Sequence, residues 1–307
     1  MRSLFLALSE SEWLRQVTAG FGPARAMVRR FVAGEELVEA VAAVQQLDRQ
    51  GILATAAHLG ENVTSETEAR DATNETLELI QAIAVNDLQS GISVKLTQLG
   101  LDMGPWLVTD NLQRVLARAE ESDRFVRIDM ESSAYVQATL DLFEEFWARY
   151  KNVGVVIQSY LYRSADDVAR LIELGASVRL VKGAYDEPPE VAYPEKADTD
   201  ANFIRLMEML FSKEAQASGV YPAIATHDTK LIEWAKDHAQ QQGISKERFE
   251  FQLLYGIRTG LQRDLVQEGY KVRAYVPYGQ QWYPYFMRRL AERPANVLFL
   301  AQNLFRS

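Results

Sequence analysis

The chain contains no cysteine among its 307 residues. It therefore has no disulfide, no thiolate metal ligand and no cysteine nucleophile, and a reducing compartment is allowed. Histidine is scarce as well, since His58, His227 and His238 are the full set and lie far apart in the sequence. Protein zinc sites draw on cysteine, histidine and carboxylate ligands, so we expect no metal centre.

Long apolar runs and an excess of positive charge are also missing. No segment approaches the roughly twenty apolar residues that span a bilayer, and the N-terminus lacks the pattern of a signal peptide, so we expect a cytoplasmic protein. The 33 basic residues are outnumbered by 42 acidic residues, which gives a net charge of −9. Because nucleic-acid binding depends on lysine and arginine neutralising phosphates, we expect no nucleic-acid partner, and any anion site must be local.

The apolar residues that are present follow two patterns. Residues 1–50 place apolar side chains at helical spacing, for example Val41, Val44 and Leu47, which predicts an N-terminal helical segment. In residues 51–307, short apolar runs alternate with longer amphipathic stretches, which is typical of repeated strand–helix units around a buried parallel sheet. The runs predict eight strands and hence a (β/α)8 TIM-type barrel domain; they cover residues 52–58, 92–97, 125–130, 153–159, 178–183, 221–227, 249–255 and 272–277.

An open, doubly wound sheet is the alternative architecture. Its dinucleotide-binding form has a G-x-G-x-x-G loop directly after the first strand. Here the first run is followed by Leu59, Gly60, Glu61 and Asn62, and no such loop occurs. In a barrel, by contrast, reacting side chains come from the carboxyl ends of many strands, so polar residues should recur at the ends of the apolar runs.

Charged residues occur near the ends of the second and third runs. Lys95 lies inside the apolar run 92–97, and such a lysine either extends its amine to solvent or projects into a polar site. Asp129 lies next to the last residue of the third run. This aspartate either balances the charge of Lys95 or caps the helix that begins near Ser132.

The fifth run carries two cations and a glycine. Strand alternation sends Arg179 and Gly183 to one face and Lys182 to the other. Two cations and a glycine in one strand indicate a large anionic ligand lying against the backbone. Other strand ends add polar or aromatic side chains, namely Gln158, Thr226, His227, Glu250, Gln252 and Tyr275. Together these positions predict one site at one face of the barrel.

The last predicted helix carries adjacent arginines, Arg288 and Arg289, with Glu292 three or four residues later. Adjacent residues lie about 100° apart on a helix, so the two arginines can straddle one ligand. A guanidinium group matches the geometry of a carboxylate or phosphate. The other interpretation is a solvated basic face held by an i, i+4 pair with Glu292.

The chain resembles the proline dehydrogenases, FAD-dependent (β/α)8 barrel enzymes of proline catabolism. The resemblance extends over roughly residues 90 to 295 and looks like the short monofunctional form, without the aldehyde dehydrogenase of the long bifunctional relatives. It rests on the segments Val-Lys-Leu-Thr (94–97), Arg-Ile-Asp-Met-Glu (127–131), Gln-Ser-Tyr-Leu (158–161), Arg-Leu-Val-Lys-Gly-Ala-Tyr (179–185), Ala-Thr-His-Asp (225–228) and Tyr-Phe-Met-Arg-Arg-Leu-Ala-Glu (285–292).

The resemblance implies a role for each matching residue. Lys95, Arg288 and Arg289 are expected to bind the proline carboxylate, and Tyr275 to pack beside the proline ring. Asp129 is an acidic active-site residue that orders these cations or the substrate amine. The expected flavin contacts are Met130, Gln158, Arg179, Lys182, Gly183, Ala184, Thr226 and His227, with Arg179 beside the reactive flavin nitrogen and Glu292 holding the arginine pair.

The family reaction implies partners. A hydride passes from the carbon beside the ring nitrogen of L-proline to FAD, giving 1-pyrroline-5-carboxylate, and a separate 1-pyrroline-5-carboxylate dehydrogenase takes the product on toward glutamate. Relatives pass the electrons to a membrane quinone. The apolar tail of residues 297–300, with Leu304 and Phe305, either contacts the inner face of the membrane as a peripheral anchor or packs on the barrel as a helix, and the packed helix is favoured.

Two other classes of function remain open at the sequence level. A barrel enzyme for a phosphorylated substrate would also use lysine and arginine at strand ends, but it usually has a glycine-rich loop after strand 7 or 8. Only the isolated Gly256, Gly260 and Gly279 occur there. A non-catalytic interaction protein would not require cations at the ends of buried strands.

Overall fold

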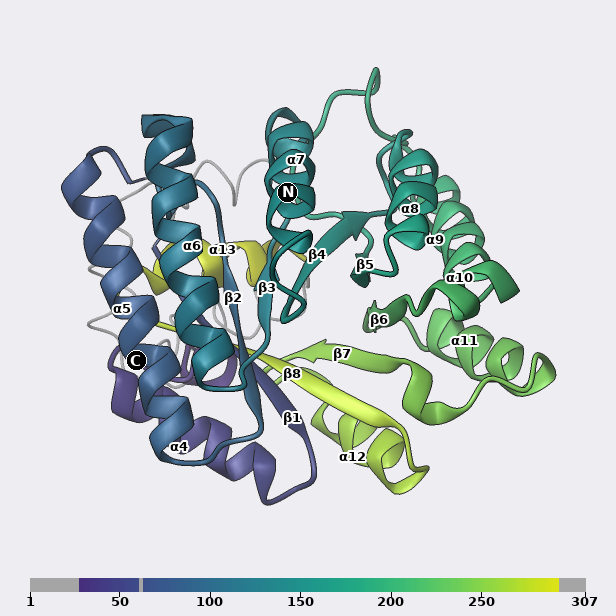
Figure 1. Cartoon of the computed structure of the whole chain (residues 1–307). Helices are drawn as coiled ribbons and strands as arrows, with labels where there is room; N and C mark the ends of the chain where they lie inside the picture. The colour runs from purple at the N-terminus through teal and green to yellow at the C-terminus, as the bar shows by residue number, and fades with distance from the viewer. Residues whose placement is uncertain (1–27, 61–62, 293–307) are drawn as a thin grey trace, which may run out of the picture.

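The computed structural model describes residues 28–60 and 63–292, the last three of them by their backbone alone. Eight parallel strands form a closed barrel in which each strand pairs with its sequence neighbours and β8 pairs with β1 (Figure 1). This confirms the predicted (β/α)8 barrel. The strands are β1 (Leu53–His58), β2 (Ser90–Val94), β3 (Val126–Ile128), β4 (Val153–Gln158), β5 (Ser177–Val181), β6 (Tyr221–Ala225), β7 (Glu250–Leu254) and β8 (Lys271–Tyr278).

The strands β2 to β7 each end one to three residues earlier than the apolar runs predicted. β2 ends at Val94 and β3 ends at Ile128, so Lys95 and Asp129 each lie one residue beyond a strand. The apolar pattern continues because the turn after β2 buries Leu96 and Leu99, which are 0% and 1% exposed. The prediction that Lys95 lies inside a strand is therefore wrong by one residue.

The helices form a layer outside the strands (Figure 1). Their inner faces supply the apolar side chains expected of amphipathic helices; in α6, for example, Leu112, Val115 and Leu116 are all 0% exposed. The α-helices are α4 (Leu37–Asp48), α5 (Glu66–Val85), α6 (Pro105–Glu121), α7 (Val136–Trp147), α8 (Ser164–Glu173), α9 (Lys196–Leu210), α10 (Lys213–Ser218), α11 (Thr229–Gln241), α12 (Thr259–Gln267) and α13 (Trp282–Glu292), with short 3-10 turns η1 (Leu101–Met103), η2 (Ser133–Tyr135) and η3 (Lys246–Arg248).

Helix α4 belongs to the predicted N-terminal helical segment and packs across β1 and β8. Its buried face, which includes Ala40, Val44 and Leu47, is part of the same apolar core as the barrel. The division of the chain at residue 50 stays a prediction. The first 27 residues of that segment, and the apolar tail of residues 297–305, lie outside the described residues.

A second apolar cluster lies at the carboxyl ends of the strands. It joins Phe31 and the aromatic face of α13, including Trp282 and Phe286, to Leu59 after β1 and Ile257 after β7. The cluster positions α13 beside the mouth of the barrel. No helix within residues 28–60 and 63–292 is both long enough and apolar enough to cross a membrane.

Candidate active site

Charged and polar side chains meet at the carboxyl ends of β2, β3, β5 and β8. Arg179 of β5 is 5% exposed, and its Nη1 donates to Oδ1 of Asp129 at 2.7 Å. The amine of Lys95 lies 3.9 Å from Oδ2 of Asp129, and the hydroxyl of Tyr275 donates to the same oxygen at 2.9 Å. The structure thus brings together four predicted site residues that are distant in the sequence.

Asp129 is the centre of this cluster. Besides its bonds to Arg179 and Tyr275, it accepts a hydrogen bond at 3.0 Å from the hydroxyl of Ser93, on β2. The next helical turn, η2, begins at Ser133, and the backbone N–H of Ser133 donates to Oε1 of Glu187 at 2.6 Å, which leaves Asp129 without a capping role there. Of the two interpretations of Asp129, the charge partner of Lys95 is therefore the one that the geometry supports.

Tyr275 is fixed as a hydrogen-bond donor. Its ring is half-buried, and burial together with the adjacent Asp129 carboxylate raises the pKa of Tyr275 well above its ordinary value. The guanidinium carbon of Arg179 lies 5.6 Å from the centre of this ring, within the range of a cation–π contact. A neutral tyrosine in this place packs against the cation and adds no negative charge to the site.

A second charged layer lies deeper in the barrel, where branched apolar side chains usually fill the interior. Glu250 is 2% exposed and accepts from Nε and Nη2 of Arg273 at 2.7 and 3.1 Å. Burial alone would raise the pKa of Glu250, but the charge and hydrogen bonds of Arg273, the hydrogen bond from Gln252 and the charge of Arg127 together hold this pKa below its ordinary value. The pair therefore remains ionised inside the protein.

Arg127 is the other buried cation of this layer. It donates from Nη1 to the backbone oxygens of Val155 and Ser177 at 3.0 and 2.7 Å. Burial and repulsion from Arg179 lower the pKa of Arg127. Its guanidinium fits because Gly154 lies opposite on β4; a Cβ there would come within 2.5 Å of Nη1.

The predicted flavin contacts lie at the ends of β3 to β6. Gln158 donates from Nε2 to the backbone oxygen of Glu131 at 3.1 Å, whereas its buried Oε1 has no hydrogen-bond partner in the part of the chain that the structure describes. Lys182 donates to Asp228 at 2.9 Å. Nε2 of His227 accepts the backbone N–H of Leu254 at 3.0 Å, so the ring proton of this histidine is on Nδ1. Met130 and Thr226 are buried beside them, and Ala184 is half-buried.

Gly183 is required by its backbone and by its neighbour. Its φ of +117° lies in the region that favours glycine, and a Cβ there would come within 2.3 Å of the ring of Tyr160. The ring of Tyr160 therefore lies directly on the backbone at the end of β5. The sequence predicted that the backbone at this glycine lies against a ligand. The contact with Tyr160 is a local reason for glycine at this position.

Helix α13 holds Arg288 and Arg289, both partly buried. The guanidinium carbon of Arg289 lies 5.1 Å from the centre of the Tyr285 ring, and the apolar face of the helix packs near Tyr275. The arginine pair thus belongs to the helix beside the strand ends. The side chain of Glu292 lies outside the described residues.

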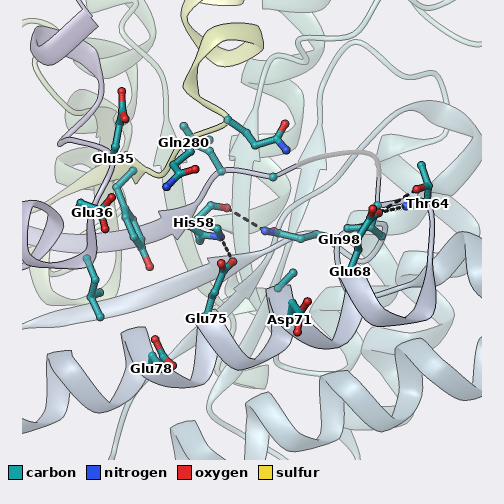
Figure 2. A pocket seen from close by; sticks show the side chains of 17 residues that line it. Glu35, Glu36, His58, Thr64, Glu68, Asp71, Glu75, Glu78, Gln98 and Gln280 are labelled. Atoms are coloured by element: carbon teal, nitrogen blue, oxygen red, sulfur yellow. Dashed lines mark hydrogen bonds and ion pairs between the residues drawn. The ribbon is translucent and has the colours of Figure 1, made fainter.

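Sequence reasoning missed an acidic cavity next to the mouth. It has a volume of about 530 Å³, and Glu68, Asp71 and Glu75 line it from α5 (Figure 2). His58, at the end of β1, lies 2.9 Å from Glu75, and burial lowers the pKa of this histidine more than the carboxylate raises it. None of the predicted site residues lines this cavity. Within residues 28–60 and 63–292, no group of three or more histidine, cysteine, aspartate or glutamate side chains could hold a metal ion.

The chain is similar in sequence to known proteins along most of its length. The family model described as proline dehydrogenase matches residues 40–302. Proline dehydrogenase 2 of Bacillus subtilis (strain 168) is 43% identical over 298 residues, which cover 97% of this chain and 96% of that protein. The proline dehydrogenase of Deinococcus radiodurans is 41% identical over 285 residues, or 91% of this chain and 90% of the relative.

A solved structure shares the fold. Proline utilization A (PutA) from Bdellovibrio bacteriovorus, inactivated by N-propargylglycine, is similar with a TM-score of 0.81 and 30% identity. The similarity covers 87% of this chain and 32% of that one. The present chain therefore spans about a third of the length of this structural relative.

Proposed function

This chain belongs to the proline dehydrogenase family and oxidises proline in proline catabolism, and we propose that the hydride acceptor is FAD, bound at the carboxyl ends of β4, β5 and β6. The observation that carries the proposal is the buried cluster in which Lys95 and Arg179 share the carboxylate of Asp129. Proline enters as a zwitterion, and a carboxylate leaves water for a buried site only when cations and hydrogen bonds receive it. Cations at the strand ends meet that requirement.

The proposed complex gives each substrate-binding residue a task. Lys95, Arg288 and Arg289 bind the carboxylate of proline, and Tyr275 packs beside its ring. Asp129 orders the cations and keeps them from repelling one another. The amine of proline gives up a proton, and the adjacent ring carbon gives up a hydride, so that a C=N bond forms and the product is 1-pyrroline-5-carboxylate.

The residues at the strand ends fit a flavin. The buried Oε1 of Gln158 is an acceptor for which the described chain provides no donor, and a flavin ring carries an N–H group that can supply one. Arg179, on the neighbouring strand β5, is a buried cation suited to the negative charge of a reduced flavin. FAD would act there as a two-electron acceptor. The other proposed flavin contacts are Met130, Lys182, Gly183, Ala184, Thr226 and His227, and Glu292 is proposed to hold the arginine pair.

Two partners complete the proposal. We assign a membrane quinone as the acceptor of the electrons, and a separate 1-pyrroline-5-carboxylate dehydrogenase as the enzyme that takes the product. The relatives named PutA, such as the bifunctional protein of Escherichia coli (strain K12), match this chain over 24% of their length. Their greater length is consistent with a second activity that this chain would obtain from another protein.

The visible spectrum of the purified protein tests the proposal. We expect a yellow protein whose flavin absorption is bleached when L-proline is added without oxygen. Protein that is shown to contain flavin and keeps its spectrum in saturating proline would contradict the proposed reaction. N-propargylglycine, a secondary amino acid with a carboxylate, should inactivate the protein with time, and proline should protect against it because both compounds occupy the same site.

A further inference from the structure

Gln252 lies inside the barrel between two charged groups of opposite sign. Its Oε1 accepts from Nε of Arg179 at 2.5 Å, and its Nε2 donates to Oε1 of Glu250. A guanidinium group only donates hydrogen bonds and an ionised carboxylate only accepts them. The amide is therefore held in one orientation, with its oxygen toward Arg179.

The far end of this connection is anchored to the barrel wall. Glu250 accepts two hydrogen bonds from Arg273, at 2.7 and 3.1 Å. Arg273 also donates from Nη1 to the backbone oxygen of Ala54, in β1, at 2.9 Å. Arg179 is thus supported from below by a chain of hydrogen bonds through Gln252, Glu250 and Arg273 that ends on the backbone.

The group of this hydrogen-bond chain that contacts Arg179 is the uncharged amide of Gln252. Arg179 already has a carboxylate partner in Asp129, at 2.7 Å, and a weaker contact with Ser93, at 3.3 Å. A second carboxylate in place of Gln252 would hold the guanidinium equally well but would cancel its charge. A neutral amide fixes the side chain and leaves its positive charge available to an anion.

We propose that Gln252 is a positioning residue that orients Arg179 toward the flavin while preserving its positive charge. This rests on the proposed function, in which Arg179 lies beside the reactive part of FAD. Without the amide, the Nε–H of Arg179 would be a buried donor lacking its acceptor, and such a donor favours another rotamer that finds one. The positive charge would then be displaced from the place where the reduced flavin carries its negative charge.

The first test replaces Gln252 with methionine, which is close in shape and has no amide. We expect kcat for proline to fall by about 10- to 100-fold, because small displacements of a positioned group cost rates of this order, while KM changes less than about threefold. The equilibrium constant for reduction of the bound flavin should fall about tenfold. For a two-electron couple this lowers the reduction potential by about 30 mV.

The matched control is Gln262→Met. Gln262 is another buried glutamine, 1% exposed, and donates to the backbone oxygens of Leu254 and Ile257 at 3.2 and 2.9 Å. Within the described residues its hydrogen bonds go to these backbone oxygens and not to the charged layer. If both variants lower the melting temperature alike while the potential and kcat of the flavin-loaded protein stay at parental values, Gln252 is only structural and the proposal fails.

A second variant, Gln252→Glu, keeps the proposal testable if the methionine variant does not fold. Its new carboxyl group lies between Glu250, whose carboxylate raises its pKa, and Arg179, whose guanidinium group lowers it, so it titrates under the influence of both charges. Protonated, it mimics the amide; ionised, it cancels the charge of Arg179. The ratio of variant to parent kcat should therefore fall as pH rises, and a ratio that is constant at the parental level overturns the proposal.

The potentials are measured with a chemical reductant, so they do not depend on proline. Parent protein that binds FAD but is not reduced by proline would contradict the proposed function. A shifted potential in Gln252→Met would still show that this residue controls the position of Arg179 near the flavin.

Discussion

Replacing Asp129 by asparagine removes one negative charge from the centre of the buried cluster and changes little else. Asparagine has the same shape, and its Oδ1 can still accept from Arg179 and Ser93, while its amide can donate to the hydroxyl of Tyr275. The loss is therefore the counter-charge of Arg179 at 2.7 Å and of Lys95 at 3.9 Å. Removing one partner of a buried ion pair typically costs about 3–5 kcal/mol. The lower end applies here, because the hydrogen bonds are retained.

A loss of about 3 kcal/mol should lower the melting temperature by roughly 6–12 °C, at roughly 2–4 °C per kcal/mol for a chain of this size class. Thermal unfolding followed by circular dichroism in protein freed of flavin measures this directly. The matched control is Asp141→Asn on the exposed face of α7, where the carboxylate accepts from Gln137 at 2.7 Å. That variant should stay within about 0.5 kcal/mol of the parent. If the melting temperature of Asp129→Asn equals that of Asp141→Asn, Asp129 is not the counter-charge of the cluster and the reasoning is refuted.

Two further predictions concern the arginine pair and the deeper charged layer. Arg288→Met or Arg289→Met should lower kcat/KM for proline by roughly 10- to 1,000-fold, since truncating a buried charged partner costs about 2–5 kcal/mol. Pyrrolidine lacks the carboxylate, so its already poor turnover should change little in the same variants. Equal losses of kcat/KM for both substrates would exclude binding of the carboxylate by these arginines. Because Arg273 holds the pKa of Glu250 below its ordinary value, their pair stabilises the fold above about pH 4.3, the ordinary pKa of glutamate, and this stability is lost as pH falls through the lower folded pKa. The double variant Glu250→Gln, Arg273→Met should show a weaker fall of melting temperature with acid than the parent, and an unchanged acid slope would argue against this linkage.

The barrel and much of its polar mouth could be predicted because both follow from local patterns. Apolar runs mark buried strands wherever they occur, and charged residues such as Lys95 and Asp129 stand out at their ends. The boundaries failed where a turn is as apolar as a strand, as with Leu96 after β2. Strand limits depend on hydrogen-bond partners from other strands, which the apolar pattern does not contain.

The residues that were missed depend on three-dimensional neighbours. Arg273 shares its strand face with Tyr275 by alternation, but its partner Glu250 is on another strand and its backbone acceptor is Ala54 on β1. Ser93 is an ordinary small residue until Arg179 and Asp129 are placed beside it. The carboxylates of α5 that line the acidic cavity have the same helical spacing as carboxylates on a solvated helix face. Their spacing in the sequence therefore could not show that they line a cavity.

The pairing of β8 with β1 has a consequence for synthesis of the chain. Arg273 and Ala54, which meet across this seam, are 219 residues apart, so a growing chain cannot close the barrel until nearly all of it has left the ribosome. Until then β1 and the latest strand to form expose unpaired backbone groups, which are templates for pairing with other chains. A chain that ends before residue 271 would hold an open sheet with two free edges and no complete charged layer, and these edges favour association with other chains.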